Sequence, residues 1–136
     1  MADIYGELIE RAKEAMHNSY ASYSHFNVGA ALLTLDGRIY TGCNIENASY
    51  TPTVCAERTA FFKAISEGER NFVAIAIAGG KDGVIGAPAA PCGVCRQVMA
   101  EFCKKDFVIC IADSKGFAKY TLGELLPMSF TADIMQ

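Results

Sequence analysis

The fold is decided by residues 54–96, which read VCAERTAFFKAISEGERNFVAIAIAGGKDGVIGAPAAPCGVCR. Two segments of helical character in this stretch flank one apolar run. The first segment, about 54–67, ends at Gly68, and glycine is the residue that most often follows the end of a helix. The apolar run 72–78 is typical of a central strand that is buried on both faces. A second helix is predicted to begin at Cys92, so the stretch reads helix, strand, helix.

The chain on either side of this stretch continues the alternation of helices and strands. Apolar residues recur at three- and four-residue steps in 3–17, which predicts an amphipathic helix. Asp36 and Gly37 form a strong hairpin signal between two strands. The predicted elements are a helix at 3–17, strands at 27–35 and 38–43, a helix at 54–67, a strand at 72–78, a helix at 92–103, strands at 107–112 and 117–121, and a short helix that reaches Leu126. This order predicts an α/β fold in which a mixed five-stranded sheet lies between helices, a three-layer α/β/α sandwich.

The length and charge of the chain narrow the class of protein. With 136 residues and no linker or repeat, residues 1–136 are expected to form a single domain. The net charge is −3, from 12 basic and 15 acidic residues, and no basic block is present. This balance argues against binding to a nucleic-acid backbone and favours a small neutral substrate.

Six cysteines raise the question of the compartment in which the protein works. The N-terminus shows neither the basic nor the apolar region of a signal peptide. No apolar run approaches the ~18 residues that span a membrane. We therefore expect a cytoplasmic protein with reduced thiols, because clustered cysteines in that compartment bind metal or catalyse more often than they form disulfides.

Three of the cysteines lie in two motifs that suit a metal. Cys55 belongs to a C-x-E motif, and Cys92 and Cys95 belong to a P-C-x-x-C motif. Thiolates select zinc, whose protein sites are tetrahedral, so three protein ligands leave one position open. A water bound at that position has its pKa lowered to roughly 7, which makes hydroxide available at neutral pH. The sequence thus predicts one open zinc site in each chain.

Two charged residues close to Cys55 are predicted to serve this site. Glu57 is in position to shuttle the proton of the attacking water. Arg58 lies three residues after Cys55, on the same side of a helix, where its guanidinium can donate hydrogen bonds to thiolates and offset their charge. Both residues also have simpler interpretations. Glu57 could stabilise a helix N-terminus, and Arg58 could form a surface ion pair.

Two other functions are compatible with part of this pattern. In a structural zinc module, Cys43 or Cys103 would close the fourth position, and Glu57 would have no purpose. In a thiol oxidoreductase, the C-x-x-C pair would be the redox centre, and the C-x-E motif would be unexplained.

Together with several other segments, the two motifs resemble the cytidine deaminases of the short, single-domain, zinc-dependent class. The resemblance spans nearly the whole chain and rests also on FNVGAAL at 26–32, GCNIENASY at 42–50, RQV at 96–98, and ELLP at 124–127 followed by Phe130. It implies a hydrolase of cyclic amidine C–N bonds that deaminates cytidine and deoxycytidine to uridine and deoxyuridine, releases ammonia and serves pyrimidine salvage. Ser22 departs from the proline that the family commonly has in its Tyr-Ala-Pro-Tyr segment, which leaves the rigidity of that loop open.

The resemblance also implies how a nucleoside is held. Asn44 and Glu46 would bind ribose hydroxyls, and Glu46 would repel a 5′-phosphate. Phe26 would pack on the pyrimidine ring, and the backbone N–H of Ala56 would bind its 2-oxo group. In the homotetramer that the resemblance implies, active sites are shared, and Phe130 would reach the ring in a neighbouring subunit's site.

These substrate contacts have alternatives. Phe26 could belong to the core, where most aromatic side chains lie. Asn44 could end a strand, Glu46 could be solvated, and Phe130 could cap its own core. The nearest rival function is a deaminase of a nucleoside antibiotic or of a free base. The pair Asn44 and Glu46 favours ordinary cytidine and deoxycytidine over these.

Overall fold

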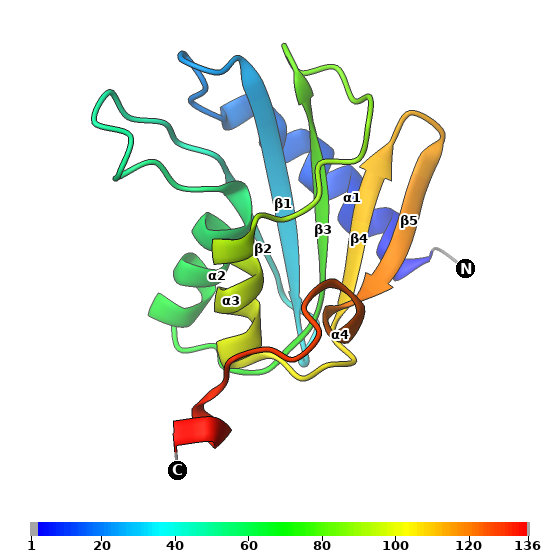
Figure 1. Ribbon diagram of the computed structural model, residues 1–136. Helices are drawn as coiled ribbons and strands as arrows, with labels where there is room; N and C mark the ends of the chain where they lie inside the picture. Colours follow the sequence, from blue (N-terminus) through cyan, green and yellow to red (C-terminus); the bar gives the residue numbers. More distant parts are fainter. Residues whose placement is uncertain (1–2, 136) are drawn as a thin grey trace.

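A computed structural model describes residues 3–135 of the chain. Its helices and strands follow the predicted order (Figure 1). They are α1 (Ile4–Ala15), η1 (Met16–Asn18), β1 (Phe26–Thr34), β2 (Ile39–Cys43), α2 (Ala56–Ser66), β3 (Phe72–Lys81), α3 (Gly93–Phe102), β4 (Val108–Asp113), β5 (Gly116–Thr121), α4 (Leu122–Leu125) and η2 (Ala132–Met135). In the described part of the chain, no helix is both long enough and apolar enough to cross a membrane.

The five strands form one mixed sheet in the order β2-β1-β3-β4-β5. Only β3 and β4 are parallel, and the other neighbours are antiparallel. α3 belongs to the connection between these two strands, because parallel neighbours need a long crossover. α1 covers one face of the sheet, and α2 and α3 cover the other (Figure 1). The predicted three-layer α/β/α sandwich is confirmed.

The two faces of the sheet bury separate apolar clusters. Strand residues alternate between them, so that Leu32 and Ile75 face α2 and α3 while Ala31 and Ala76 face α1. Phe61 of α2 is fully buried in the first cluster. This packing holds α2 and α3 side by side on one face, which fixes the relative positions of their N-termini.

α2 lies against β2 with no room between them. A Cβ atom added to Gly42 would lie 2.5 Å from the Ala60 nitrogen and 2.6 Å from the Ala56 oxygen, both of which belong to the helix backbone. Any larger residue at Gly42 would push α2 outward. Gly42 therefore allows the first turn of α2 to lie this close to the sheet.

The predicted boundaries lie within two residues of the observed ones, with one exception. The predicted strand 72–78 ends before Gly79 and Gly80, but these two glycines continue β3 and pair with Val28 and Asn27 of β1. A Cβ atom at Gly80 would lie 1.8 Å from the Val84 oxygen. The glycine is needed because the following turn folds back over the strand, so here it marks a close approach of two backbone segments and not a break.

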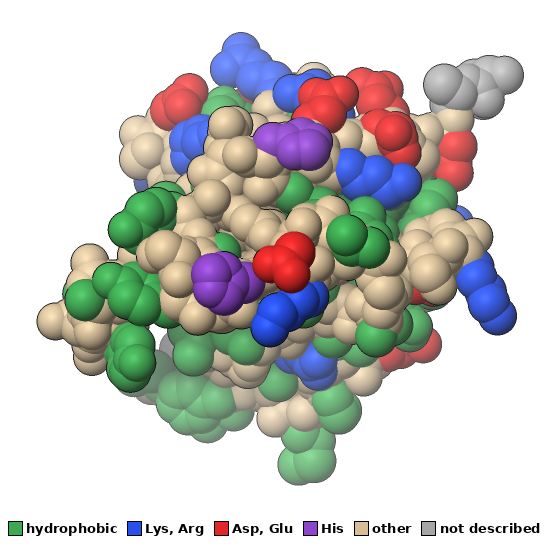
Figure 2. Space-filling model, turned by 90° about the horizontal axis from the view of Figure 1, so that it is seen from above, with side chains coloured by type: hydrophobic (Ala, Val, Ile, Leu, Met, Phe, Trp, Pro, Cys, Tyr) green, Lys and Arg blue, Asp and Glu red, His purple; other side chains and the backbone are tan. Residues whose placement is uncertain are grey.

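Charged side chains of both signs are mixed on the end of the molecule that is shown in Figure 2. Lysine and arginine side chains are scattered among acidic and histidine side chains, without a continuous basic surface on this face. The net charge of −3 agrees with this mixed pattern. That the chain does not bind nucleic acid stays a prediction.

Candidate active site

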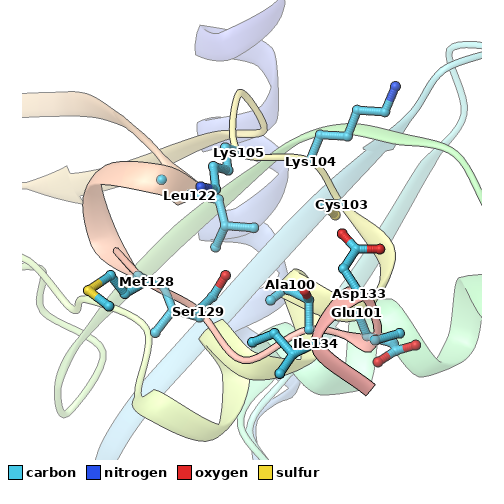
Figure 3. Close-up of a pocket in the computed structure, with 14 residues that line it drawn as sticks. Ala100, Glu101, Cys103, Lys104, Lys105, Leu122, Met128, Ser129, Asp133 and Ile134 are labelled. Carbon is cyan, nitrogen blue, oxygen red and sulfur yellow. The ribbon is translucent and has the colours of Figure 1, made fainter. Parts of the chain in front are cut away.

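One cavity of about 470 Å³ lies beside the C-terminal tail (Figure 3). It lies between the end of α3, α4 and the tail, with Leu122, Met128 and Ile134 among its lining residues. It contains none of the predicted site residues. Residues on both sides of Phe130 line this cavity. The tail around Phe130 therefore borders the cavity and is not packed against a continuous surface.

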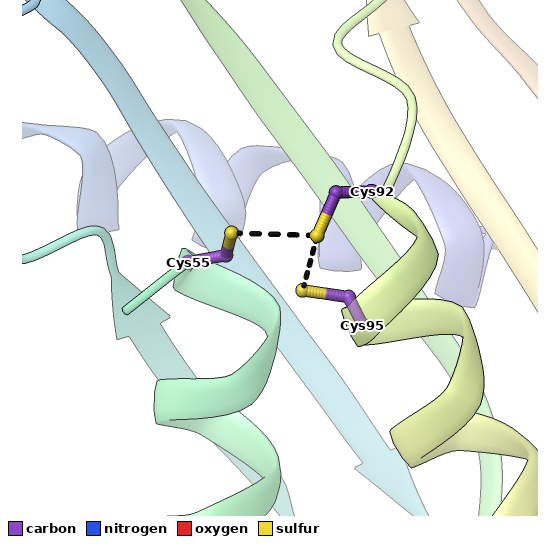
Figure 4. A group of neighbouring side chains, drawn as sticks. All are labelled: Cys55, Cys92 and Cys95. Atoms are coloured by element: carbon purple, nitrogen blue, oxygen red, sulfur yellow. Dashed lines mark hydrogen bonds between the residues drawn. The ribbon is translucent and has the colours of Figure 1, made fainter. Parts of the chain in front are cut away.

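The three predicted zinc ligands lie together at the start of two helices. Cys55 is the N-cap of α2 and Cys92 is the N-cap of α3, whereas Cys95 lies in the first turn of α3. Their side chains point toward one another from the two helices (Figure 4). The Sγ atoms of Cys55 and Cys92 are 3.7 Å apart, and those of Cys92 and Cys95 are 3.6 Å apart. All three Sγ atoms lie within 4.8 Å of one another.

This spacing fits a tetrahedral zinc ion. With zinc–sulfur bonds of about 2.3 Å, two sulfur ligands of a regular tetrahedron lie roughly 3.8 Å apart. In residues 3–135, the cluster of metal-ligating side chains holds these three cysteines and no fourth member. Cys43 and Cys103, which a closed structural site would need, are not in it. Burial raises the pKa of Cys103 to about 12, which keeps that side chain a thiol at neutral pH.

Positive charge reaches the cluster from α2. Nη2 of Arg58 lies 3.4 Å from Sγ of Cys55 and donates to it. The neighbouring Cys95 thiol and the Arg58 guanidinium together lower the pKa of Cys55 to about 5, against the cost of burial. Nε of Arg58 is buried and has no hydrogen-bond partner in the described part of the chain. Arg58 is thus directed into the thiol cluster, and the salt bridges found in residues 3–135 do not include it.

Glu57 lies in the first turn of α2, two residues after Cys55, and only 4% of it is exposed. Burial, with a further contribution from the Cys55 sulfur, raises the pKa of its carboxyl group to about 7. A carboxyl group with this pKa can both accept and donate a proton near neutral pH. The alternative, in which Glu57 only stabilises the N-terminus of the helix, would not require its side chain to be buried beside three thiols.

Asn44 follows β2, and only 8% of it is exposed. Its side chain pairs with β1 as a backbone group would, since Oδ1 accepts from the Val28 N–H at 2.9 Å and Nδ2 donates to the Phe26 carbonyl at 2.8 Å. The second Nδ2 proton is not used in these bonds. Asn44 therefore ends the strand pairing and keeps one donor for another partner.

Glu46 is not simply solvated, because the loop before β1 surrounds its carboxylate. Oε1 accepts from the backbone N–H groups of Tyr23 and Ser24, each at 3.0 Å, and Oε2 accepts from the Ser24 hydroxyl. The Ser24 hydroxyl is the main cause that lowers the pKa of Glu46. The side chain is thus held as an anion at neutral pH.

The two phenylalanines that were predicted to contact the pyrimidine do not belong to either core cluster. Phe26 begins β1 and is 38% exposed, so the alternative that it is a core residue is wrong. Phe130 is 58% exposed, and its carbonyl accepts from Nε2 of Gln97 at 2.7 Å. Ala56, whose N–H was predicted to bind the substrate, is the first residue of α2 and is fully buried.

Two residues that form hydrogen bonds with predicted site residues were not themselves predicted. Ser24 contacts Glu46, which lies 22 residues away in the sequence, and Gln97 contacts Phe130, which lies 33 residues away. Neither contact has a local sequence signal, because a serine in a loop and a glutamine in a helix are usually solvated. Only the polar-rich loop before β1 and the RQV segment of α3 could have directed attention to them.

Known proteins share this architecture and these motifs. A family described as "Cytidine and deoxycytidylate deaminase zinc-binding region" matches residues 3–111. The chain is 48% identical to a cytidine deaminase of Sporosarcina psychrophila over 93% of this chain and 91% of that protein. It is 50% identical to a cytidine deaminase of Halalkalibacterium halodurans over 94% and 95%. A crystal structure of a cytidine deaminase from Burkholderia pseudomallei has a TM-score of 0.85 and 46% identity, and covers 96% of this chain and 100% of that one.

Proposed function

This chain belongs to the cytidine and deoxycytidylate deaminase family, and we propose that it deaminates cytidine and deoxycytidine hydrolytically to uridine and deoxyuridine with release of ammonia. The observation that carries the proposal is the cluster of three cysteines at two helix N-termini beside a buried glutamate. The enzyme is a zinc-dependent hydrolase of a cyclic amidine, and it would serve pyrimidine salvage. We place it in the cytoplasm, where the six free thiols would stay reduced.

The residues present can hold one zinc ion, through Cys55, Cys92 and Cys95. When bound there, zinc supplies a Lewis acid that makes water nucleophilic at neutral pH. The chain itself moves the protons. Glu57 takes one proton from the attacking water and delivers it to N3 of the pyrimidine as the water oxygen bonds to C4. It then carries the second proton to the amino group, the C4–N bond breaks, and ammonia and a C4 carbonyl remain.

The substrate-binding roles are also proposed. Asn44 has one Nδ2 proton available for a ribose hydroxyl, and the Glu46 carboxylate can accept a hydrogen bond from one. Phe26 is exposed enough to pack on the pyrimidine. The N–H of Ala56 belongs to the first turn of α2, where helical N–H groups lack partners within the helix, so it can bind the 2-oxo group.

The direct test is an ultraviolet assay of the purified protein with cytidine, deoxycytidine, cytosine and adenosine. We expect turnover of the two pyrimidine nucleosides, because the sugar-binding pair requires a sugar. Little turnover is expected with cytosine or adenosine. Turnover of cytosine at the rate of cytidine would contradict the nucleoside assignment, and no turnover of any of the four would overturn the proposed function.

Arg58 gives a prediction about the charge of the site. Three thiolates and one zinc ion carry a net charge of about −1, which the guanidinium offsets. We expect Arg58→Gln to lower kcat for cytidine by about 10- to 100-fold, the usual loss when a group that supports a metal ligand is removed. Steady-state kinetics with zinc quantified on the same sample would measure it. Arg58→Lys, which keeps the charge, should retain more activity, and an unchanged kcat in Arg58→Gln would refute the role.

We also propose that the chain forms a homotetramer in which Phe130 completes the active site of a neighbouring subunit. Two observations support this arrangement. The Phe130 side chain is exposed in a single chain, and the residues around it stand over a cavity. The bond from Gln97 holds the Phe130 backbone but leaves the ring free of the core.

A mixing experiment separates a trans role of Phe130 from a cis role. Inactive Glu57→Ala chains are unfolded together with Phe130→Ala chains and refolded as mixed oligomers. If Phe130 acts in trans, random mixing at equal amounts restores about a quarter of all sites. If it acts in cis, every site still lacks one group. Activity no higher than the mean of the two parents, with subunit exchange confirmed by mass spectrometry, would sink the trans assignment.

A further inference from the structure

The Glu46 carboxylate is held by an unusual number of donors for a side chain on an open loop. Three hydrogen bonds reach it, two from the backbone N–H groups of Tyr23 and Ser24 and one from the Ser24 hydroxyl. All three come from a segment more than twenty residues earlier in the sequence. A solvated glutamate needs no such support. The arrangement therefore fixes the direction in which the carboxylate points.

The Ser24 hydroxyl has only one orientation in this arrangement. Its oxygen accepts from the Phe26 N–H at 3.0 Å. Since an ionised carboxylate only accepts, the hydroxyl proton must point to Oε2 of Glu46. The chain of bonds thus runs from the Phe26 N–H through Ser24 to Glu46, and each bond polarises the next.

The backbone between these residues is held in a conformation that it would not adopt without support. His25, between Ser24 and Phe26, has φ = 58°, in the left-handed region that residues other than glycine rarely occupy. Its N–H donates to the Ala21 carbonyl at 2.8 Å. With this backbone at His25, the Phe26 N–H reaches back to the Ser24 hydroxyl.

The carboxylate keeps one place for a ligand. Two carboxylate oxygens have about four acceptor positions, and residues 3–135 use three of them, so these residues leave one position on Oε2 open. Glu46 and Ser24 also line a cavity of about 270 Å³, together with Tyr23 and Tyr50. A ligand group in that cavity that binds Glu46 must donate a hydrogen bond, as a sugar hydroxyl does.

We propose that Ser24 is a positioning residue for sugar recognition, which orients Glu46 so that its one remaining acceptor position is presented to a hydroxyl of the nucleoside. The proposal rests on the proposed function, and in particular on the role of Glu46. It assigns to Ser24 no contact with the reacting atoms. It predicts that loss of the Ser24 hydroxyl affects binding of the sugar and leaves the chemical step intact.

The test compares Ser24→Ala with the wild type on two substrates, cytidine and 2′,3′-dideoxycytidine. For cytidine we expect kcat/KM to fall about 10-fold, mainly through KM, which corresponds to one hydrogen bond to a charged group. For 2′,3′-dideoxycytidine, which lacks the two ring hydroxyls that Glu46 is proposed to accept from and keeps only the 5′-hydroxyl, we expect a change of less than about 2-fold. Ser24→Thr keeps the hydroxyl and should restore most of the KM for cytidine.

Two controls make the result specific. Ser22→Ala changes a serine of the same loop whose side chain makes no hydrogen bond with the described residues, and it should leave both substrates unaffected. In a Glu46→Gln background, Ser24→Ala should cost much less than it does alone, because the two residues act as one unit. If Ser24→Ala folds poorly, Ser24→Cys serves instead, since a thiol has a similar size and is a weaker donor.

The outcomes separate this proposal from the proposed function. A wild-type protein that does not deaminate cytidine overturns the function itself. An active wild type in which Ser24→Ala loses the same factor on both substrates, or loses nothing on cytidine, overturns the positioning role alone. A loss confined to kcat would also overturn it.

Discussion

Glu57→Gln is expected to lower kcat for cytidine by about 10,000-fold, the upper range for removal of a general acid–base group. The amide has nearly the shape of the carboxyl group but cannot accept the proton of water or return it to the amine. Glu57 is buried beside the cysteine cluster, and burial raises its pKa to about 7, so the natural side chain is suited to both transfers. The measurement is kcat, with zinc content and thermal midpoint determined on the same protein.

The matched control for this variant is Glu67→Gln. Glu67 is an exposed residue at the other end of α2, and its neutralisation should leave kcat, zinc content and folding unchanged. Glu57→Gln should differ from it in kcat alone. A Glu57→Gln protein that keeps more than about a tenth of the wild-type kcat would remove Glu57 from the proton transfers.

Cys92→Ala is expected to remove both the metal and the activity. Two thiolates hold zinc far less well than three, so zinc content should drop from about one ion per chain to a small fraction. The reaction then loses its Lewis acid, and kcat/KM should fall more than about 1,000-fold. The fold should survive, because Cys92 is exposed and its side chain does not cap α3 by a hydrogen bond.

The matched control is Cys43→Ala, at a half-buried cysteine outside the cluster. This variant should keep its zinc and its turnover. Metal analysis, circular dichroism and the cytidine assay on both variants decide the matter. A Cys92→Ala protein with full zinc content, or equal losses in the two variants, would contradict the three-cysteine site.

The sequence was sufficient to place the metal-binding residues. Cys92 and Cys95, three residues apart at the start of a helix, must lie on one side of its first turn. Cys55 precedes another helix whose apolar face packs on the same side of the sheet, so the two helix starts meet. Regular elements carry these positions, and their geometry follows from hydrophobic periodicity and the helix boundaries.

The surroundings of the sugar-binding residues could not be predicted in the same way. The bonds from Ser24 to Glu46 depend on how an irregular loop folds across 22 residues, and the backbone of that loop is left-handed at His25. The sequence does not encode such a turn by a glycine or by a known turn motif. The position of Gly80 in a strand could not be predicted for a related reason, because the close approach of Val84 depends on the folded structure.

The exposed phenylalanines show a further limit. An aromatic side chain is most often part of a core, but this alternative is wrong for Phe26. The resemblance to deaminases, and not the residue type, indicated a substrate role for it. The same holds for Phe130, whose role in a neighbouring subunit stays a prediction until oligomers are mixed.

An open zinc site made by three cysteines is proposed to carry out the deamination, and a zinc titration tests this most directly. The protein is stripped of metal with a chelator, zinc is added in steps, and conversion of cytidine to uridine is followed by ultraviolet absorbance at each step. We expect no activity without metal, then a linear rise that stops at one zinc per chain. Full activity in the metal-free protein, or activity that does not respond to added zinc while zinc binds, would contradict it.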